Sequence, residues 1–192
     1  MKKGLIVVII LVVLAAWAGM GYNGLVKKDE VVKKEWAEVQ NQYQRRANLI
    51  PNLVNTVKGA ANFEQKTLTD VIEARAKATQ MKVDASNLTP EKLAEFQAAQ
   101  GQLSQALGRL MMVTENYPNL KANQNFLDLQ AQLEGTENRI TVARKNYNES
   151  VMNFNTKARS FPTIIFAKMF GMTQKATFEA DAAAQQAPTV NF

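Results

Sequence analysis

The chain contains neither cysteine nor histidine among its 192 residues. The absence of cysteine excludes disulfide bonds and thiolate chemistry. The absence of histidine removes the commonest general base and the commonest zinc ligand. The sequence also lacks a glycine-rich phosphate loop and a nucleophile elbow. Acid–base chemistry would depend on carboxylates, lysine or tyrosine, and we expect no catalytic, cofactor-binding or metal-binding residues.

A strong excess of one charge is also missing. The chain carries 23 lysine and arginine residues against 17 aspartate and glutamate residues, which gives a net charge of +6. This mild excess is spread along the chain, and no basic stripe is interleaved with aromatic residues. Nucleic-acid-binding proteins usually concentrate their basic residues on one face. We therefore expect no nucleic-acid partner.

The chain does have one long apolar run, residues 4–22, which contains no charged residue. As a helix this run would span about 28 Å, close to the thickness of a bilayer core. It could be a single-pass anchor or a cleavable signal peptide, because residues 16–18 fit the small-x-small cleavage pattern. The anchor is favoured because the run continues past that pattern and because Trp17 and Tyr22 suit a membrane interface.

The orientation of this anchor depends on its two flanks. A short basic tail, residues 1–3, precedes it, and a mixture of basic and acidic residues lies after it from Lys27 to Glu35. The count of positive charges is therefore nearly even. A short basic tail before an apolar run resembles a signal anchor, which exports the part of the chain on its C-terminal side. We expect a single-pass protein of the bacterial cell (inner) membrane with its body on the extracytoplasmic side.

After Gly24 the apolar residues follow helical spacing, with no alternating strand pattern of useful length. A first segment runs from about Lys27 to about Lys82, with steps of three and four that are typical of a coiled-coil seam. A second begins at Thr89, a good N-cap residue, and ends near Pro118. A third runs from Phe126 to Phe161. Polar members of these seams, Glu64, Gln100 and Thr114, are expected to fix register.

These segments predict an all-α fold, in which an N-terminal transmembrane helix is followed by a long-helix antiparallel three-helix bundle. The bundle runs up-down-up, and a short C-terminal helix or loop completes it. The predicted divisions are a basic tail at 1–3, the anchor at 4–22, the bundle at 23–161 and a C-terminal part at 162–192. The apolar run at 163–172 could cap the bundle or dock on the membrane, and capping is the simpler interpretation.

Pro51 lies inside the first helical segment. A proline within a helix removes one hydrogen bond and clashes with the carbonyl four residues earlier, here that of Ala47. The apolar spacing nevertheless keeps its phase from Tyr43 to Val54. We therefore predict that Pro51 kinks one helix and does not separate two.

The same segment has a face that is unusually poor in charge. With Ile50 at the centre of the core side and about 100° between residues, the opposite face collects a set of asparagines and one glycine. These residues are Asn41, Asn48, Asn52, Asn55, Gly59 and Asn62. A solvated face could tolerate such mediocre helix formers. Alternatively, amides that both donate and accept could pack against a neighbouring copy, which predicts a homo-oligomer on the membrane.

Several stretches of the chain together resemble the LemA family. They are "YNGLV", "RRANLIPNLVNTVKGAANFE", "ALGRLMMVTENYPNLKANQNFLDLQAQLEGTENRI", "ARKNYNESVMNFNTKARSFP" and the closing "FGM…FEA". The resemblance covers essentially the whole chain, and it implies a membrane-anchored helical bundle without an established catalytic activity. One departure is "ANFE", where the family more often has a histidine before the glutamate. That difference counts against metal or acid–base chemistry at this point.

These observations leave two classes of function. The first is a structural or interaction protein, anchored in the lipid bilayer, that assembles with itself as a scaffold or membrane organiser. The second is an enzyme or enzyme subunit that uses core carboxylates, for example around a non-heme metal. Bundle enzymes of the di-iron type need Glu-x-x-His pairs, which a chain without histidine cannot supply. The structural class is therefore preferred, and the sequence identifies no protein partner beyond a second copy.

Overall fold

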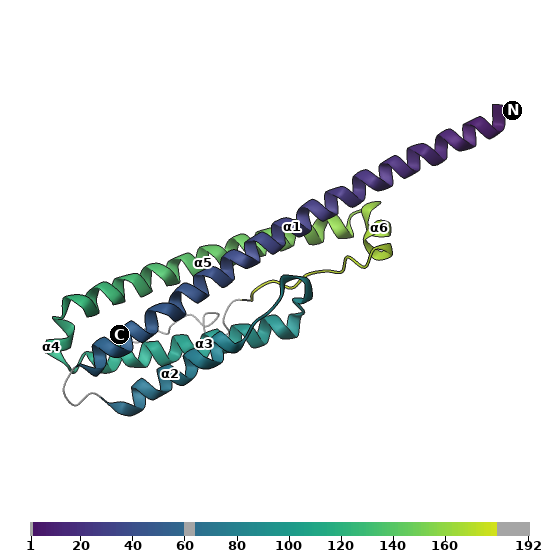
Figure 1. Ribbon diagram of the computed structural model, residues 1–192. Coiled ribbons are helices and arrows are strands. Elements are labelled where there is room, and N and C mark those ends of the chain that lie inside the picture. The colour runs from purple at the N-terminus through teal and green to yellow at the C-terminus, as the bar shows by residue number, and fades with distance from the viewer. Residues whose placement is uncertain (1, 60–63, 180–192) are drawn as a thin grey trace, which may run out of the picture.

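The computed structural model describes residues 2–59 and 64–179, and their elements are all helices (Figure 1). Asn62 of the predicted interface and the end of the predicted C-terminal part lie outside the described residues. The elements are α1 (Lys2–Lys58), α2 (Gln65–Gln80), a 3-10 turn η1 (Ala85–Asn87), α3 (Pro90–Thr114), α4 (Pro118–Lys121), α5 (Gln124–Arg159) and α6 (Thr163–Met169). No strand occurs in this part of the chain, so the all-α fold is confirmed.

The first third of α1 projects alone from an elongated body (Figure 1). Beyond it, α1 packs along its length against antiparallel α5, and α2 packs against α3 beside that pair. We call the end of the body from which α1 projects the anchor end, and the end that carries α4 the far end. The helix Gly4–Lys58 is the one among the described residues that is long and apolar enough to cross a membrane, and its most apolar window has a mean hydropathy of 2.6 with nothing buried.

The bundle has four long helices and not three, because the first predicted segment divides. Helix α1 ends at Lys58 and α2 begins at Gln65, so α2 returns toward the anchor end. One helix over residues 27–82 would be about 84 Å long, whereas α5 offers about 54 Å of packing surface. Folding back lets the second half bury its apolar stripe against α3. Glu64, which the spacing placed in the seam, is exposed before α2.

The predicted start of the second helical segment is confirmed, and a further side-chain cap begins α5. Thr89 accepts a hydrogen bond from the backbone N–H of Lys92 at 3.3 Å, with proline at the first helical position of α3. The side-chain oxygen of Asn123 accepts from the N–H groups of Asn125 and Phe126 at 2.9 and 3.3 Å. These caps satisfy donors that have no partner inside the helix.

The core consists of two clusters of different character. The aromatic cluster lies toward the anchor end and is built around Trp36, Tyr43, Phe96, Tyr147, Phe154 and Phe178, with aliphatic residues around them. The aliphatic cluster lies toward the far end, and Phe126 is the single aromatic residue among its buried members, which include Ile50, Leu53, Leu103 and Leu110. The predicted seam residues of α3 and α5 form much of both clusters.

The predicted short C-terminal helix is α6, and a glycine ends it. Gly171 has a φ of +67°, a left-handed conformation that favours glycine. Its N–H donates to the carbonyl of Lys168, and the N–H of Met172 donates to that of Ala167 at 2.9 Å, which together form a Schellman motif. Residues 171–179, here called the C-terminal strap, then run back along the bundle (Figure 1). Phe161, predicted as a seam residue, is 82% exposed because α5 ends at Arg159.

Candidate functional site

The predicted asparagine face is present on the surface of α1. Its described members are all exposed: Asn41, Asn48, Asn52, Asn55 and Gly59. Their spacing of seven, four, three and four residues places them on one side of a helix. That side is opposite to Ile50, Leu53 and Val57, which are fully buried in the aliphatic cluster. The Asn48 side-chain oxygen accepts a hydrogen bond from Gln44 at 2.8 Å. We call this surface the asparagine face.

Pro51 is exposed and α1 continues through it to Lys58, so it does not separate two helices. Whether it bends α1 stays a prediction. Because proline has no N–H, the carbonyl of Ala47 loses its partner four residues on. The structure supplies a substitute: Arg75 of α2 donates its Nε–H to this carbonyl at 2.8 Å. The carbonyl that Pro51 leaves without a hydrogen bond inside α1 thus binds the returning helix α2.

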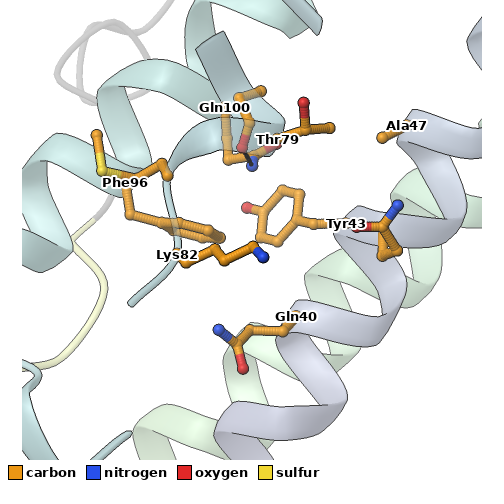
Figure 2. A pocket seen from close by; sticks show the side chains of 10 residues that line it. Gln40, Tyr43, Ala47, Thr79, Lys82, Phe96 and Gln100 are labelled. Atoms are coloured by element: carbon orange, nitrogen blue, oxygen red, sulfur yellow. Dashed lines mark hydrogen bonds between the residues drawn. The ribbon is translucent and has the colours of Figure 1, made fainter. Parts of the chain in front are cut away.

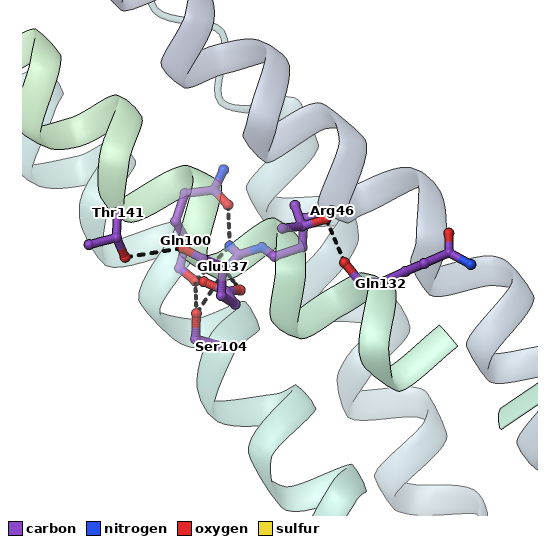
Figure 3. Close-up of polar contacts among 7 residues, drawn as sticks. Arg46, Gln100, Ser104, Gln132, Glu137 and Thr141 are labelled. Atoms are coloured by element: carbon purple, nitrogen blue, oxygen red, sulfur yellow. Dashed lines mark hydrogen bonds and ion pairs between the residues drawn. The ribbon is translucent and has the colours of Figure 1, made fainter. Parts of the chain in front are cut away.

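Between the two clusters lies a buried arginine that the sequence did not single out. Arg46 is 1% exposed, and its guanidinium donates to Glu137 of α5 at 2.6 Å. It also donates to the side chain of Gln100 on α3 at 2.6 Å and to the Ser104 hydroxyl at 2.9 Å (Figure 3). Tyr43 places its ring 5.0 Å from the guanidinium carbon. We call Arg46, Gln100, Ser104 and Glu137 the polar layer.

The polar layer connects all four long helices. Gln100 accepts from Arg46 of α1 and donates to the carbonyl of Ala78 at the end of α2 at 3.3 Å. Glu137 connects α5 to the layer. Its side chain is 47% exposed, so the carboxylate keeps part of its hydration. Gln100, which the seam predicted to fix register, is buried where α1, α2 and α3 meet, and its effect on register stays a prediction. Arg46 lies one residue outside the predicted seam, which is why the spacing did not identify it.

Two hollows adjoin this layer. A cavity of about 410 Å³ between α1, α3 and α5 is lined by the layer and by Gln97, Thr141 and Arg144. A smaller one of about 100 Å³ lies between α1 and the α2–α3 pair, where Tyr43 faces Lys82, Phe96 and Gln100 (Figure 2). The guanidinium of Arg46 in this layer already forms an ion pair with Glu137. The described residues contain no group of three His, Cys, Asp or Glu side chains that could hold a metal ion.

The C-terminal strap is held by two asparagines of α5, seven residues apart on one face. Asn155 donates to the carbonyl and accepts from the N–H of Lys175, both at 2.9 Å. Asn148 makes the same pair of bonds with Phe178, at 3.0 and 2.8 Å. Each amide thus pairs with backbone much as a neighbouring strand would. The sequence pattern did not predict this arrangement, because an extended segment has no helical period to recognise.

The strap closes the aromatic cluster with Phe178. Its ring stacks on Trp36, with centroids 6.0 Å apart, and meets Tyr147 edge to face at 5.5 Å. Burial raises the pKa of Tyr147, whose hydroxyl donates to the carbonyl of Ala176 at 2.9 Å. Lys175 also pairs with Asp29 of α1 at 2.7 Å. The strap is therefore a structural part of the bundle and not a loose tail up to residue 179.

Burial by itself would raise the pKa of Asp29. Hydrogen bonds from Lys175 and Lys33 outweigh this effect and hold the pKa of its carboxyl below the ordinary value. The ammonium of Lys33 lies 2.9 Å from Asp29 and 2.7 Å from Glu30, and bonds to these carboxylates, first to Glu30, raise the pKa of Lys33. This cluster ties the strap to α1 just beyond the apolar run.

Several known proteins are similar to this chain over most of its length. The sequence profile of the LemA family matches residues 35–192. Protein LemA of Metamycoplasma hominis is 26% identical over 158 residues, which are 82% of this chain and 68% of that protein. Magnetosome protein MamQ 2 of Paramagnetospirillum magneticum is 25% identical over 181 residues, with 83% of this chain and 65% of that protein covered. Magnetosome protein MamQ of Magnetospirillum gryphiswaldense is 25% identical, with 79% and 62% covered.

The matched region thus spans less than two thirds of the length of these MamQ proteins. The family profile, by contrast, matches most of this chain, from the bundle part of α1 through its last residue. On that match, the chain belongs to the LemA family.

Proposed function

We propose that this protein is a membrane-anchored scaffold without catalytic activity, which assembles with copies of itself through the asparagine face. The observation that carries the proposal is that Asn48, Asn52 and Asn55 are exposed together on a helix that continues directly from the apolar run. The proposed place is the cell (inner) membrane, with a single span and with the bundle on the extracytoplasmic side.

The continuity of α1 supports this assembly. No described turn interrupts the helix between residues 4–22 and the bundle. Copies anchored in one bilayer would therefore stand with their helices in the same direction and present the same face at the same height. A symmetric interface needs a surface that matches itself, and parallel anchoring reduces the freedom that association must remove.

The chemistry of the face supports a copy as the partner. An amide side chain both donates and accepts, so it can bond to another amide without a buried charge. Between Ala47 and Val57 the chain carries no charged residue, so identical faces do not repel each other there. The buried Arg46 and the exposed Lys58 flank this uncharged stretch. A solvated helix surface would more often carry lysine and glutamate, which favour helices and solubility.

The test is the mass of the full-length protein in detergent. The double variant Asn52→Lys with Asn55→Glu places charges in the centre of the face. We expect the parent to run as an assembly and this variant to run as a smaller species with unchanged helix content. The matched control, Gln102→Lys with Gln105→Glu, makes the same change on exposed residues of α3 and should keep the parent mass. An unchanged mass for the Asn52/Asn55 variant would show that the face is only solvated.

A further inference from the structure

Helix α6 lies beside the end of the apolar run of α1. The ring of Phe166 packs edge to face on Trp17, with centroids 5.9 Å apart. Phe170 meets Tyr22 at 4.7 Å. A Cβ added to Gly21 would lie 3.6 Å from the ring of Phe166, an ordinary van der Waals distance, so the ring lies directly over the α1 backbone there. If residues 4–22 cross a bilayer, these contacts set α6 at the depth of its headgroup region.

The two sides of α6 differ in polarity and burial. Thr163 and Ala167, four residues apart, are buried against the bundle. Ile165 and Met169, also four apart and on the opposite side, are 55% and 65% exposed. Phe161 and Phe170 extend this exposed apolar surface at the two ends of the helix. It is continuous with the exposed apolar surface of α1, to which α6 is joined through Trp17 and Tyr22.

The chain segment that contains α6 carries charge of one sign. Residues 150–178 contain four basic residues and no acidic residue. Two of the basic side chains, Arg159 and Lys168, are exposed beside the apolar surface. A short apolar helix flanked by cations matches an interface between acyl chains and anionic headgroups. If a second copy of this chain packed on this surface through the same residues, the basic side chains of the two copies would repel each other. A second copy is therefore disfavoured as the partner of this surface.

The apolar side cannot turn inward. Ala167 packs in the aromatic cluster, and the Schellman motif at Gly171 fixes the direction in which the chain leaves α6. Met172 of the strap also packs against this cluster. The helix is therefore held at its place with Ile165 and Met169 facing away from the protein.

We propose that α6 is a second membrane-contact site, with Phe161, Ile165, Met169 and Phe170 inserted into the surface of the bilayer that α1 crosses. The proposal rests on the membrane anchoring proposed above. Together, a spanning helix and a surface helix fixed to it set the tilt of the bundle. Every copy would then present its asparagine face in the same orientation.

The absence of cysteine allows a direct measurement on the full-length chain. Single variants Ile165→Cys, Leu11→Cys and Met112→Cys carry a small polarity-sensitive fluorophore in vesicles of phosphatidylcholine with a minority of phosphatidylglycerol. Met112 is an exposed apolar residue of α3 and serves as the matched control. Lipids with a nitroxide at a shallow acyl position quench fluorophores near the bilayer surface, and lipids with a deep nitroxide quench those at its centre.

We expect shallow nitroxides to quench the label at position 165 several-fold more than the label at position 112, and deep nitroxides to quench the label at position 11. Quenching at 11 without quenching at 165 would overturn the α6 site and leave the anchor intact. A blue-shifted but unquenched label at 165 would mean that protein covers the surface, which also overturns it. No quenching at position 11 would overturn the anchor and the α6 site together.

Discussion

The anchor end and the far end of the bundle are built by different means. At the far end, four helices bury aliphatic side chains against one another over short connections. At the anchor end, α1 and α5 extend beyond the α2–α3 pair (Figure 1). The core on that side is built around aromatic rings. One of those rings, Phe178, comes from the strap. The comparison teaches that helical packing suffices where four helices overlap, whereas the anchor end needs a segment from late in the chain.

Arg46 separates the two ends, and its replacement should have the largest effect. Arg46→Ala leaves Gln100, Ser104 and the Glu137 carboxylate without their shared donor. Removing one member of a buried ion pair destabilises strongly, and with Glu137 half exposed we expect a loss of about 3 kcal/mol. Chemical unfolding in detergent measures the change. The adjacent exposed Arg45→Ala should shift stability by no more than about 0.5 kcal/mol. Equal effects of the two variants would show that the polar layer has no structural role.

Phe178→Ala should weaken the anchor end alone. Burying a phenylalanine contributes roughly 2 kcal/mol, and detachment of the strap limits the loss to the stability of its docking. Hydrogen exchange should rise around Trp36 and Tyr147 and stay unchanged around Leu103 and Leu110. Thr177→Ala, an exposed neighbour, is the control. A uniform rise over both clusters would contradict the division of the bundle into two differently stabilised ends.

The attachment of α2 at the far end can be tested by a double-mutant cycle. Arg75→Met leaves the Ala47 carbonyl without a donor, at an expected cost of about 1.5 kcal/mol. In a Pro51→Ala background, the new N–H at position 51 can bond to that carbonyl within the helix. Arg75→Met should then cost clearly less. Equal costs in both backgrounds would mean that Arg75 does not replace the bond that proline removes.

The smallest expected effect is on the stability of the protein at acidic pH. The pKa of Asp29 is lowered in the folded protein, so its contribution to stability is complete above the unfolded value of about 3.9. That contribution is lost as the pH falls through the folded pKa. The stability of the parent and of Asp29→Asn, measured against pH, should therefore differ at neutral pH and converge in acid. Curves that stay parallel down to the most acidic pH would exclude a role for this carboxylate in holding the strap.

Regular helices and their buried stripes could be predicted from the sequence because each depends on local spacing. Thr89 signals a helix start through a bond to the backbone three residues away. The end of α1 also had a local signal, a last-turn lysine followed by Gly59, but the continuing apolar phase concealed it. The prediction of one long first segment was wrong because a helix of that length needs a packing partner of matching length.

The polar layer and the strap could not be predicted in the same way. Arg46 is buried because Gln100 and Glu137, more than fifty residues away, meet it from two other helices. Phe178 is buried because Asn148 and Asn155 hold an extended backbone that has no period of its own. Both depend on long-range contacts. The asparagine face differs from these two features. Its residues and their common side of α1 follow from helical spacing alone, whereas the molecule that binds this face cannot be predicted from spacing.

Cross-linking between copies in the membrane tests the central proposal of self-assembly most directly. Asn48→Cys, Asn52→Cys and Asn55→Cys place single thiols on the asparagine face of a chain that has none, and Gln102→Cys places one on the exposed side of α3. With a short thiol cross-linker applied to membranes, we predict covalent dimers for the three α1 positions and little product for position 102. Equal yields at all four positions, or none on α1, would contradict the proposal that this face joins one copy to the next.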